Sequence, residues 1–547
     1  MKYGISWWMF LFLLLPLDPA AGQEQVSFDH SLWKMKSNRE AFAAIMEGHP
    51  DTALAMMQRY LEKGADAAEI YYGMSVAWFS KKEPEKGMEY FRKALEAGLP
   101  IERFMAGPRS VLQPLYRDPY FLEKTKGKEL VDGPLLGCMT ANSVEVWVRT
   151  FHEVPVVVKV GKNPLLVGET LTFTGKTSSS RDYTVKVQVN GLEPSTEYFY
   201  SVMVDGKKGT IRSFRTFPLT GSPSVVKIAF GGGAAYYPPA EKIWKVIRDS
   251  RPHLFIGMGD NVYIDHPEMP EVQRFCYYQR ESSPPFRKMT AVVPYYAVWD
   301  DHDFGKNDAW GGPDPDRPAW KRVVLEVFRE NTVNPSYGGG EEHPGTWYKV
   351  SVGQVDLFML DTRYYRTPSW VDRDRAKGAP PPDMLGPVQL AWLKKELKSS
   401  SATFKVVVSS VPWSDGAKDV MEGRYDTWRG YAAQRKEIFD FLTQHHIGGV
   451  ILLSADRHRH DVWRHDRQKD YALYEFTSSR LTNIHYHPLR PGALFGYNEK
   501  CGFGMLEFHT EVARPYVIFR IINVDKEVID EIRIYRYQLD DKFVMGK

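Results

Sequence analysis

Cysteine is scarce in this 547-residue sequence, which contains only Cys138, Cys276 and Cys501. An odd number of widely spaced cysteines cannot form a disulfide framework, so at most one bridge can join them. We interpret all three as buried thiols that pack as small apolar side chains. The fold must therefore be held together by its hydrophobic core rather than by disulfides.

A net excess of charge is also lacking. Lys and Arg number 71 and Asp and Glu 68, which leaves a formal charge of +3. Because the sequence has no basic stripe either, it predicts no nucleic-acid-binding patch. Beyond the N-terminus no apolar run is long enough to cross a bilayer, so the mature chain is expected to have no transmembrane segment. The length of the chain is too great for one hydrophobic core and predicts a multidomain protein.

Residues 1–22 have the layout of a cleavable signal peptide. Lys2 provides the positive charge, residues 5–17 form the apolar run, and Ala20-Ala21-Gly22 provides small residues for cleavage. A membrane anchor is the alternative interpretation, but the apolar run is shorter than the roughly 20 residues that a span requires. We therefore expect a periplasmic or secreted protein.

Residues 23–128 are expected to form an α-helical region. Within it, residues 67–100 match a tetratricopeptide-like (TPR-like) repeat, with Tyr71, Trp78 and Gly87 at offsets where that repeat packs its paired helices. A plain helical hairpin is an equally good interpretation. Stacked repeats need about three units for independent stability, so this region is expected to dock on its neighbour or on a protein partner.

Residues 129–219 change to a period of two, which is typical of β-strands. Val144, Val146 and Val148 alternate with other residues, and the same alternation returns in later segments. Short strands separated by Gly, Pro and Asn-Gly turns predict a β-sandwich. The run Leu192-Glu193-Pro194 resembles the corner of a fibronectin type III domain, and we expect no catalysis there.

Residues 220–547 alternate apolar strands with amphipathic helices, which is the pattern of an α/β domain. The expected strands include residues 225–230, 254–257, 355–360 and 450–453. In α/β sheets the polar groups that follow the carboxyl ends of the strands form the site. The candidate functional residues are therefore those that follow these strands.

Four short polar segments follow buried strands in this domain: Gly259-Asp260-Asn261-Val262-Tyr263, Trp299-Asp300-Asp301-His302-Asp303, Asp361-Thr362-Arg363 and Ser454-Ala455-Asp456-Arg457-His458. A single Asp in such a place is usually a helix cap or a turn residue. Four such strand ends, two of them with His, are difficult to explain in that way. Carboxylates gathered at one sheet edge would repel one another unless cations neutralised them. Oxygen-rich sites with some imidazole suit Ca²⁺, Mg²⁺, Mn²⁺ or ferric iron, and a binuclear or larger cluster could activate water and clamp a phosphoryl group.

In combination these segments resemble the alkaline phosphatase D family of the metallophosphoesterase superfamily. Two further motifs carry the resemblance: Gly133-Pro134-Leu135-Leu136-Gly137 and Leu385-Gly386-Pro387-Val388-Gln389-Leu390-Ala391-Trp392-Leu393. The resemblance extends from about residue 134 to the end of the sequence. It implies an α/β metallophosphatase core of four layers, and it leaves the helical region outside the family's usual extent.

The resemblance also implies a metal-binding role for five residues. Asp260 corresponds to the carboxylate that bridges two metals, and Tyr263 to the phenolate ligand of a ferric ion. Asp301 takes the place of a metal-binding Asn. Asp456 and His458 match the last metal-binding motif of the superfamily.

His302 corresponds to the catalytic His of the superfamily. As an imidazolium it could protonate the leaving oxygen without binding metal. Arg363 could bind the substrate phosphate through two parallel hydrogen bonds, and a structural pair with Asp361 is an equal alternative. Asp300 and Asp303 are expected to support the ligands rather than to bind metal.

One departure from the family concerns the ferric ion. Where members commonly carry a Cys ligand, this chain reads Gly231-Gly232-Gly233-Ala234, with Gly233 at about the position of that Cys. Glycine has no side chain to bind a metal. We therefore expect weak ferric binding and greater reliance on Ca²⁺, Mg²⁺ or Mn²⁺.

The sequence thus predicts an exported hydrolase of phosphate mono- or diesters in which metal-activated water attacks phosphorus. A phosphodiesterase or phospholipase D-like enzyme is the nearest alternative. The alternative from another class is a catalytically degenerate metallophosphatase that acts as a binding protein through its helical repeats. Retention of His302 argues against the binding protein, which needs no acid for a leaving group.

Overall fold

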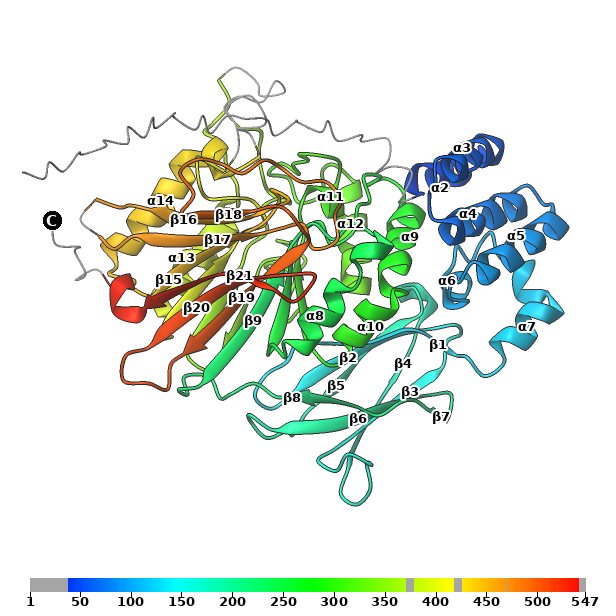
Figure 1. Cartoon of the computed structure of the whole chain (residues 1–547), viewed down its shortest axis with the longest axis horizontal. Coiled ribbons are helices and arrows are strands. Elements are labelled where there is room, and N and C mark those ends of the chain that lie inside the picture. Colours follow the sequence, from blue (N-terminus) through cyan, green and yellow to red (C-terminus); the bar gives the residue numbers. More distant parts are fainter. Residues whose placement is uncertain (1–37, 370–377, 418–425, 469, 541–547) are drawn as a thin grey trace, which may run out of the picture.

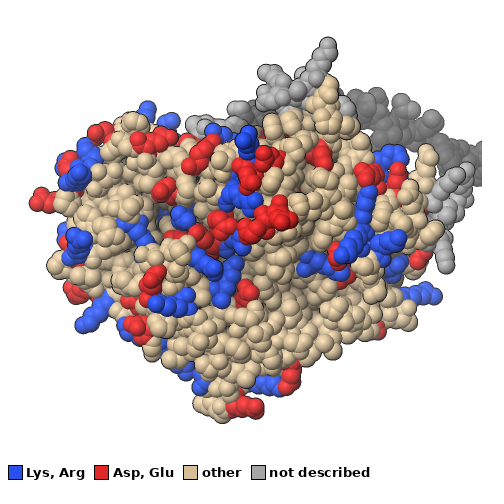
Figure 2. All heavy atoms as spheres, turned by 180° about the vertical axis from the view of Figure 1, so that it is seen from behind, with Lys and Arg blue, Asp and Glu red and all other residues tan. Residues whose placement is uncertain are grey.

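The computed structural model describes residues 38–369, 378–417, 426–468 and 470–540 (Figure 1). The signal peptide expected at residues 1–22 lies outside these ranges. Within them, no helix combines the length and the apolar character that crossing a membrane requires. All three cysteines carry free thiols, Cys276 buried and Cys138 and Cys501 half-buried. On the face opposite to that of Figure 1, Lys and Arg are interspersed with Asp and Glu (Figure 2).

Short helices come first in the described chain. They are α2 (Arg39–Met46), α3 (Pro50–Glu62), α4 (Ala67–Ser80), α5 (Pro84–Glu96), α6 (Glu102–Ala106) and α7 (Pro119–Thr125), with a 3-10 turn at Leu115–Arg117. Pro50 and Pro84 stand in the first turn of their helices, where the missing N–H has no helical partner to lose. Gly87 lies against the Phe79 ring, where a Cβ atom would come within 2.9 Å, so α4 and α5 pack closely.

Two small sheets follow the helices. Their strands are β1 (Leu130–Gly137), β2 (Val144–Thr150), β3 (Pro155–Gly161), β4 (Leu171–Lys176), β5 (Thr184–Val189), β6 (Glu197–Val204), β7 (Lys207–Lys208) and β8 (Arg212–Arg215). One sheet has the order β1-β2-β5, and the other has the order β4-β3-β6-β7 with β8 paired to β6. Val146 of β2 and Val158 of β3 are buried in the same apolar cluster, so the period of two in the sequence directs alternate side chains into a shared core.

Two larger mixed sheets form the rest of the molecule. The first has the order β11-β10-β9-β19-β20-β21 and the second β12-β13-β14-β15-β17-β16-β18. The strands of the first are β9 (Val225–Gly231), β10 (Leu254–Met258), β11 (Tyr295–Val298), β19 (Gly502–His509), β20 (Tyr516–Asn523) and β21 (Val528–Tyr535). Those of the second are β12 (Tyr348–Val352), β13 (Val355–Met359), β14 (Phe404–Val408), β15 (Val450–Ser454), β16 (His460–His465), β17 (Leu473–Ser478) and β18 (Phe495–Tyr497). In the first sheet three neighbouring strands at one side, β9 to β11, are parallel, and in the second sheet β13, β14, β15 and β17 are parallel.

Helices lie on the outer faces of the two large sheets (Figure 1). Beside the first are α8 (Ile243–Asp249), α9 (Pro270–Glu281), α10 (Pro284–Thr290), α11 (Asp301–Phe304) and α12 (Trp320–Asn331); beside the second are α13 (Pro387–Ser399) and α14 (Ala432–Gln444). Ile228 and Phe230 of β9 belong to the apolar cluster that the two sheets share, whereas Ala229 belongs to the cluster with Ile243 of α8. The buried strands thus have apolar side chains on both faces, which explains their continuous apolar runs. The expectation of a multidomain protein with an α/β core is confirmed.

Candidate metal centre

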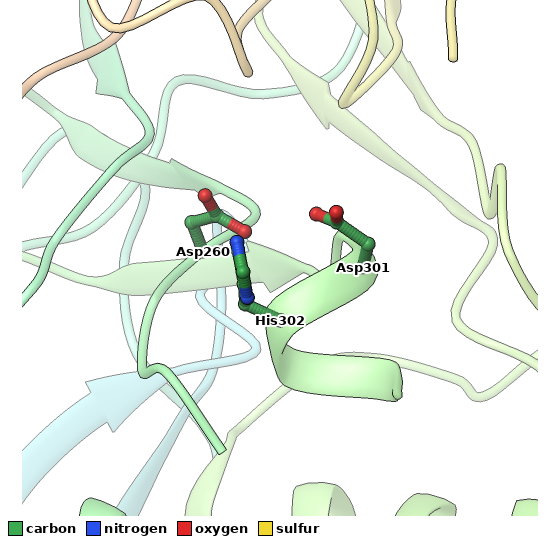
Figure 3. A group of neighbouring side chains, drawn as sticks. All are labelled: Asp260, Asp301 and His302. Atoms are coloured by element: carbon green, nitrogen blue, oxygen red, sulfur yellow. The ribbon is translucent and has the colours of Figure 1, made fainter. Parts of the chain in front are cut away.

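The candidate site lies where parallel strands of both large sheets end. Asp260 follows β10, Asp301 and His302 open α11 just after β11, and His458 follows β15. The two carboxylates and the imidazole of Asp260, Asp301 and His302 gather around one space (Figure 3). One potential ligand atom from each of these three residues lies within 4.8 Å of the others. Residues of three of the four polar segments therefore lie together, but they come from the strand ends of two sheets and not from the edge of one sheet.

The backbone at this edge is held in an unusual conformation. Asp260, Asp456 and His458 have φ values of 50°, 63° and 47°, in the left-handed region that non-glycine residues rarely adopt. Such a conformation costs on the order of 1–3 kcal/mol per residue and persists only where its surroundings enforce it. One enforcing contact is the Asp303 carboxylate, which accepts the backbone N–H of Asn261 at 2.9 Å. Asp303 thus supports the site, as expected, through the loop that carries Asp260.

Several buried polar atoms in the site have no hydrogen-bond partner among the described residues. Oδ1 of Asp260, Oδ1 of Asp301 and Nδ1 of His458 are buried and accept no hydrogen bond from any described residue. His458 Nε2 lies 4.0 Å from Oδ2 of Asp260. Buried polar atoms are almost always paired, so Oδ1 of Asp260 and Nδ1 of His458 need a partner beyond the described residues, while Oδ1 of Asp301 has Arg363 Nη2 at 3.7 Å without a hydrogen bond. A cation is the partner that suits two carboxylate oxygens and an imidazole nitrogen.

The electrostatics of the site also favour bound cations. Burial raises the pKa of Asp260 well above its usual range; the charge of His302 opposes this rise and that of Asp301 adds to it. Burial likewise raises the pKa of Asp300, whereas the positive charge of Arg363 lowers it. Burial lowers the pKa of His458, which keeps the imidazole neutral and able to bind a metal. Without added positive charge, this group of carboxyls could not all be ionised at neutral pH.

His302 is oriented by a carboxylate that the sequence did not reveal. Its Nδ1 lies 2.5 Å from Oδ1 of Asp265. Burial lowers the pKa of His302, but the charges of Asp265, Asp301 and Asp260 outweigh it and raise that pKa well above the usual value. Because Asp265 occupies Nδ1, Nε2 is the nitrogen left for the site. Asp265 comes two residues after Tyr263 in an irregular loop, so neither helical nor strand periodicity identifies it in the sequence.

Arg363 is fully buried within a network of ion pairs. Its guanidinium lies 2.5 Å from Oδ1 of Asp300 and 2.7 Å from Oδ1 of Asp426. Asp361, the structural partner that the sequence suggested, instead accepts the backbone N–H of Arg363 at 2.9 Å. The pairing partner is therefore different from the expected one, because the side chain extends away from its own loop toward α11.

A second acidic group adjoins the first. Ligand atoms of Asp301, Asp308 and Asp426 lie within 4.8 Å of one another. Asp308 and Asp426 were not predicted from the sequence, since each is an isolated Asp that does not come directly after a buried strand. Asp456, a predicted ligand, lies 3.0 Å from Arg457 and belongs to neither group, although its charge contributes to the raised pKa of Asp300.

Two histidines left unassigned by the sequence lie beside His458. The ring centroids of His485 and His487 are 5.1 Å and 5.8 Å from that of His458. Both come from the chain after β17, where Asn483 also donates a hydrogen bond of 2.7 Å to the Tyr263 hydroxyl. This segment therefore forms one wall of the site.

Gly233 occupies a turn that excludes a side chain. Its φ is +70°, and a Cβ atom there would lie 3.0 Å from the backbone nitrogen of Arg480. Its carbonyl accepts the N–H groups of Thr482 and Asn483 at 3.2 and 3.1 Å. The chain thus uses glycine to bring two loops together at the position where the resemblance leads one to expect a Cys ligand.

Comparisons with known proteins agree with this geometry. The family model of PhoD-like phosphatase matches residues 228–496, and that of the PhoD-like phosphatase N-terminal domain matches residues 122–218. Alkaline phosphatase D of Bacillus subtilis (strain 168) is 23% identical over 399 residues, which are 64% of this chain and 67% of that protein. The solved structure of PhoD matches with a TM-score of 0.62 and 19% identity, covering 75% of this chain and 90% of that one. Purple acid phosphatase PPD1 from yellow lupin (Lupinus luteus) seeds matches with a TM-score of 0.53 and 13% identity, covering 74% and 75%.

Proposed function

The chain belongs to the PhoD-like phosphatase family, which makes it a metal-dependent phosphoesterase, and we propose that it is an exported enzyme that hydrolyses phosphate mono- or diesters. The observation that carries the proposal is the buried group of Asp260, Asp301 and His302, with ligand atoms within 4.8 Å of one another. Oδ1 of Asp260 and Oδ1 of Asp301 accept no hydrogen bond from the described residues, which supports a cation in that space.

Five residues would hold the metal ions: Asp260, Tyr263, Asp301, Asp456 and His458. Carboxylate and phenolate oxygens with one imidazole suit Ca²⁺, Mg²⁺ or Mn²⁺, and ferric iron is the alternative. Since Gly233 provides no thiolate, we propose that ferric iron is the more weakly held ion. Bound metal ions would lower the pKa of a water molecule for attack on phosphorus and neutralise the phosphoryl oxygens.

His302 would act as the acid that completes the cleavage. Asp265 holds Nδ1 at 2.5 Å and fixes the plane of the ring. Nε2–H would donate its proton to the ester oxygen as the bond between that oxygen and phosphorus breaks, so the alcohol leaves neutral. The raised pKa of His302 supports this role, since the acid must carry a proton at neutral pH.

We also propose how the chain is divided. Residues 1–22 would be a signal peptide, which directs the protein to the periplasm or the medium. Residues 23–128 would be a TPR-like region, 129–219 a fibronectin type III-like sandwich and 220–547 the metallophosphatase domain with its four layers. The positions of α2 to α7, β1 to β8 and the two large sheets support the last three intervals.

The acid role of His302 is tested by a series of phosphate esters with leaving groups of different basicity. His302→Ala should lower kcat by about 10² to 10⁴ for alkyl phosphates and by less for p-nitrophenyl phosphate, with metal content unchanged. The matched control is His253→Ala, because His253 accepts the N–H of Lys227 at 3.1 Å and directly precedes β10, whose other end carries Asp260. Equal losses for good and poor leaving groups, or loss of metal, would reject the role.

A further inference from the structure

The first described helix lies outside both family models yet contacts the active-site loop. Helix α2 packs against α9 (Figure 1). The rings of Phe42 and Phe275 stack at this interface with centroids 4.2 Å apart. The family models begin at residue 122, after α2 to α6. Helix α9 begins at Pro270, and the loop before it carries Tyr263 and Asp265. Packing of α2 on α9 therefore places the start of α2 beside that loop.

Arg39, the first residue of α2, extends from this interface into the active-site loop. Its side chain is 1% exposed. Nη1 lies 2.6 Å from Oδ2 of Asp265 and donates to the carbonyl oxygen of Tyr263 at 2.7 Å. The other oxygen of the same carboxylate, Oδ1 of Asp265, is the atom that holds Nδ1 of His302. Arg39, Asp265 and His302 thus form a continuous chain of contacts across one carboxylate.

We propose that Arg39 is a positioning residue of this active site, which fixes the Asp265 carboxylate that orients His302. The proposal rests on the proposed function of His302 as the leaving-group acid. It also means that the helical region is a working part of the catalytic unit, rather than only a surface for a separate protein.

The local geometry shows why Asp265 needs a second partner. Asp265 lies in an irregular loop with a φ of 53°, and its carboxylate is held by contacts from two other elements, α2 and α11. With one oxygen on Arg39 and the other on His302, the carboxylate cannot rotate without losing a contact. Groups of this kind, one contact removed from the reacting atoms, typically change activity by about 10- to 100-fold when removed.

Arginine is better suited than lysine to this position. Its guanidinium presents several N–H groups in a fixed plane, and Arg39 uses them for Asp265, the Tyr263 carbonyl and Glu40, whose Oε1 accepts from Nη2 at 2.9 Å. The bond to the carbonyl of Tyr263 ties the same side chain to the loop that carries Asp265. A lysine would keep the charge but could not hold all three groups in one plane.

A double-mutant cycle with His302 tests the proposal on the full chain. Arg39→Ala should lower kcat about 10- to 100-fold with little change in KM, and the loss should be larger for an alkyl phosphate than for p-nitrophenyl phosphate. In a His302→Ala background, Arg39→Ala should change kcat by less than about twofold, because the residue through which it acts is absent. Arg39→Lys should restore part of the loss.

The matched control is Arg109→Ala. Arg109 also joins the helical region to its neighbour, donating to the carbonyl oxygens of Thr150 at 3.0 Å and Phe151 at 2.6 Å, but it does not contact the active-site loop. The kcat of Arg109→Ala should stay within about twofold of the wild-type value for both esters. If Arg39→Ala does not fold, Asp265→Asn replaces it in the double-mutant cycle with His302→Ala. This substitution keeps the shape of the Asp265 side chain and removes its ion pair with Arg39.

Two results would overturn the role of Arg39: an equal loss for both esters, or the same fold-loss in the wild-type and His302→Ala backgrounds. Each would show that Arg39 acts on the fold and not through His302. If His302 is not the leaving-group acid, the result is different: the single variant His302→Ala would keep the wild-type kcat for alkyl phosphates.

Discussion

The Tyr263 hydroxyl donates a hydrogen bond of 2.8 Å to Oδ2 of Asp260, while Oδ1 of that carboxylate has no hydrogen-bond partner among the described residues. The phenol and the carboxylate therefore share one buried space. Burial raises the pKa of Tyr263, and the charge of Asp260 raises it further, so the phenol stays protonated unless a cation binds beside it. A cation bound beside Tyr263 and Asp260 would lower the pKa of the phenol, so Tyr263 would lose its proton when metal binds.

Tyr263→Phe should therefore weaken metal binding and lower kcat/KM by at least about tenfold, because one anionic oxygen donor is lost. The matched control is Tyr295→Phe, since the hydroxyl of Tyr295 is also buried and donates to Asn261 Oδ1 at 2.9 Å, one residue from Asp260. Metal content is measured after dialysis against limiting metal. If Tyr263→Phe keeps the metal content and kcat/KM of the control, Tyr263 is not a ligand.

Gly233 leads to a prediction about stability and metal identity. The purified protein should be pale and depend on added Ca²⁺, Mg²⁺ or Mn²⁺, since no thiolate stabilises a ferric ion. Gly233→Cys should gain little iron and should lower the thermal unfolding midpoint, because its φ of +70° and the nearby Arg480 nitrogen both oppose a side chain.

The control for that substitution is Gly221→Ala. Gly221 has a φ of +82° with nothing within 4 Å of an added Cβ atom, so it isolates the cost of the backbone conformation, roughly 1–2 kcal/mol. Gly233→Ala should be destabilised more than Gly221→Ala. Strongly coloured wild-type protein with one iron per chain would contradict the account of Gly233.

Replacement of Arg363 by Ala distinguishes a structural role of this side chain from contact with the substrate. Arg363→Ala would leave the buried carboxylate of Asp300 without its main cation, which typically costs about 3–5 kcal/mol, whereas Asp426 would keep its ion pair with Arg366. We therefore expect a lower unfolding midpoint together with a lower kcat. An unchanged midpoint with a raised KM would show instead that Arg363 binds the substrate phosphate.

Much of the site could be predicted because it depends on local rules. A carboxylate after a buried strand is visible in the sequence, and parallel strands bring such residues to one edge, which is how Asp260, Asp301 and His302 were found. The period of two and the alternation of strands with helices likewise revealed the sheets.

The remaining parts of the site depend on contacts between distant segments. Arg39 and Tyr263 are 224 residues apart, and only the packing of α2 on α9 brings them together. Asp265 and Asp426 lie in irregular loops, and side chains there are positioned by tertiary contacts rather than by any repeat. Of the two alternatives for Arg363, the pair with Asp361 is not found, because Asp361 bonds to backbone N–H groups and the guanidinium pairs with Asp300 and Asp426 from other loops.

The most direct test of the central claim is the metal content and kcat/KM of Asp260→Asn beside the wild type. If Asp260 bridges two metal ions, the variant should lose bound metal, and kcat/KM should fall by at least about 10³, which corresponds to roughly 4 kcal/mol. Asp356→Asn is the matched control, since Asp356 is a buried carboxylate of β13 whose partners are Ser351, Ser400 and Lys349. A metal-loaded Asp260→Asn enzyme with the turnover of the wild type would contradict the claim.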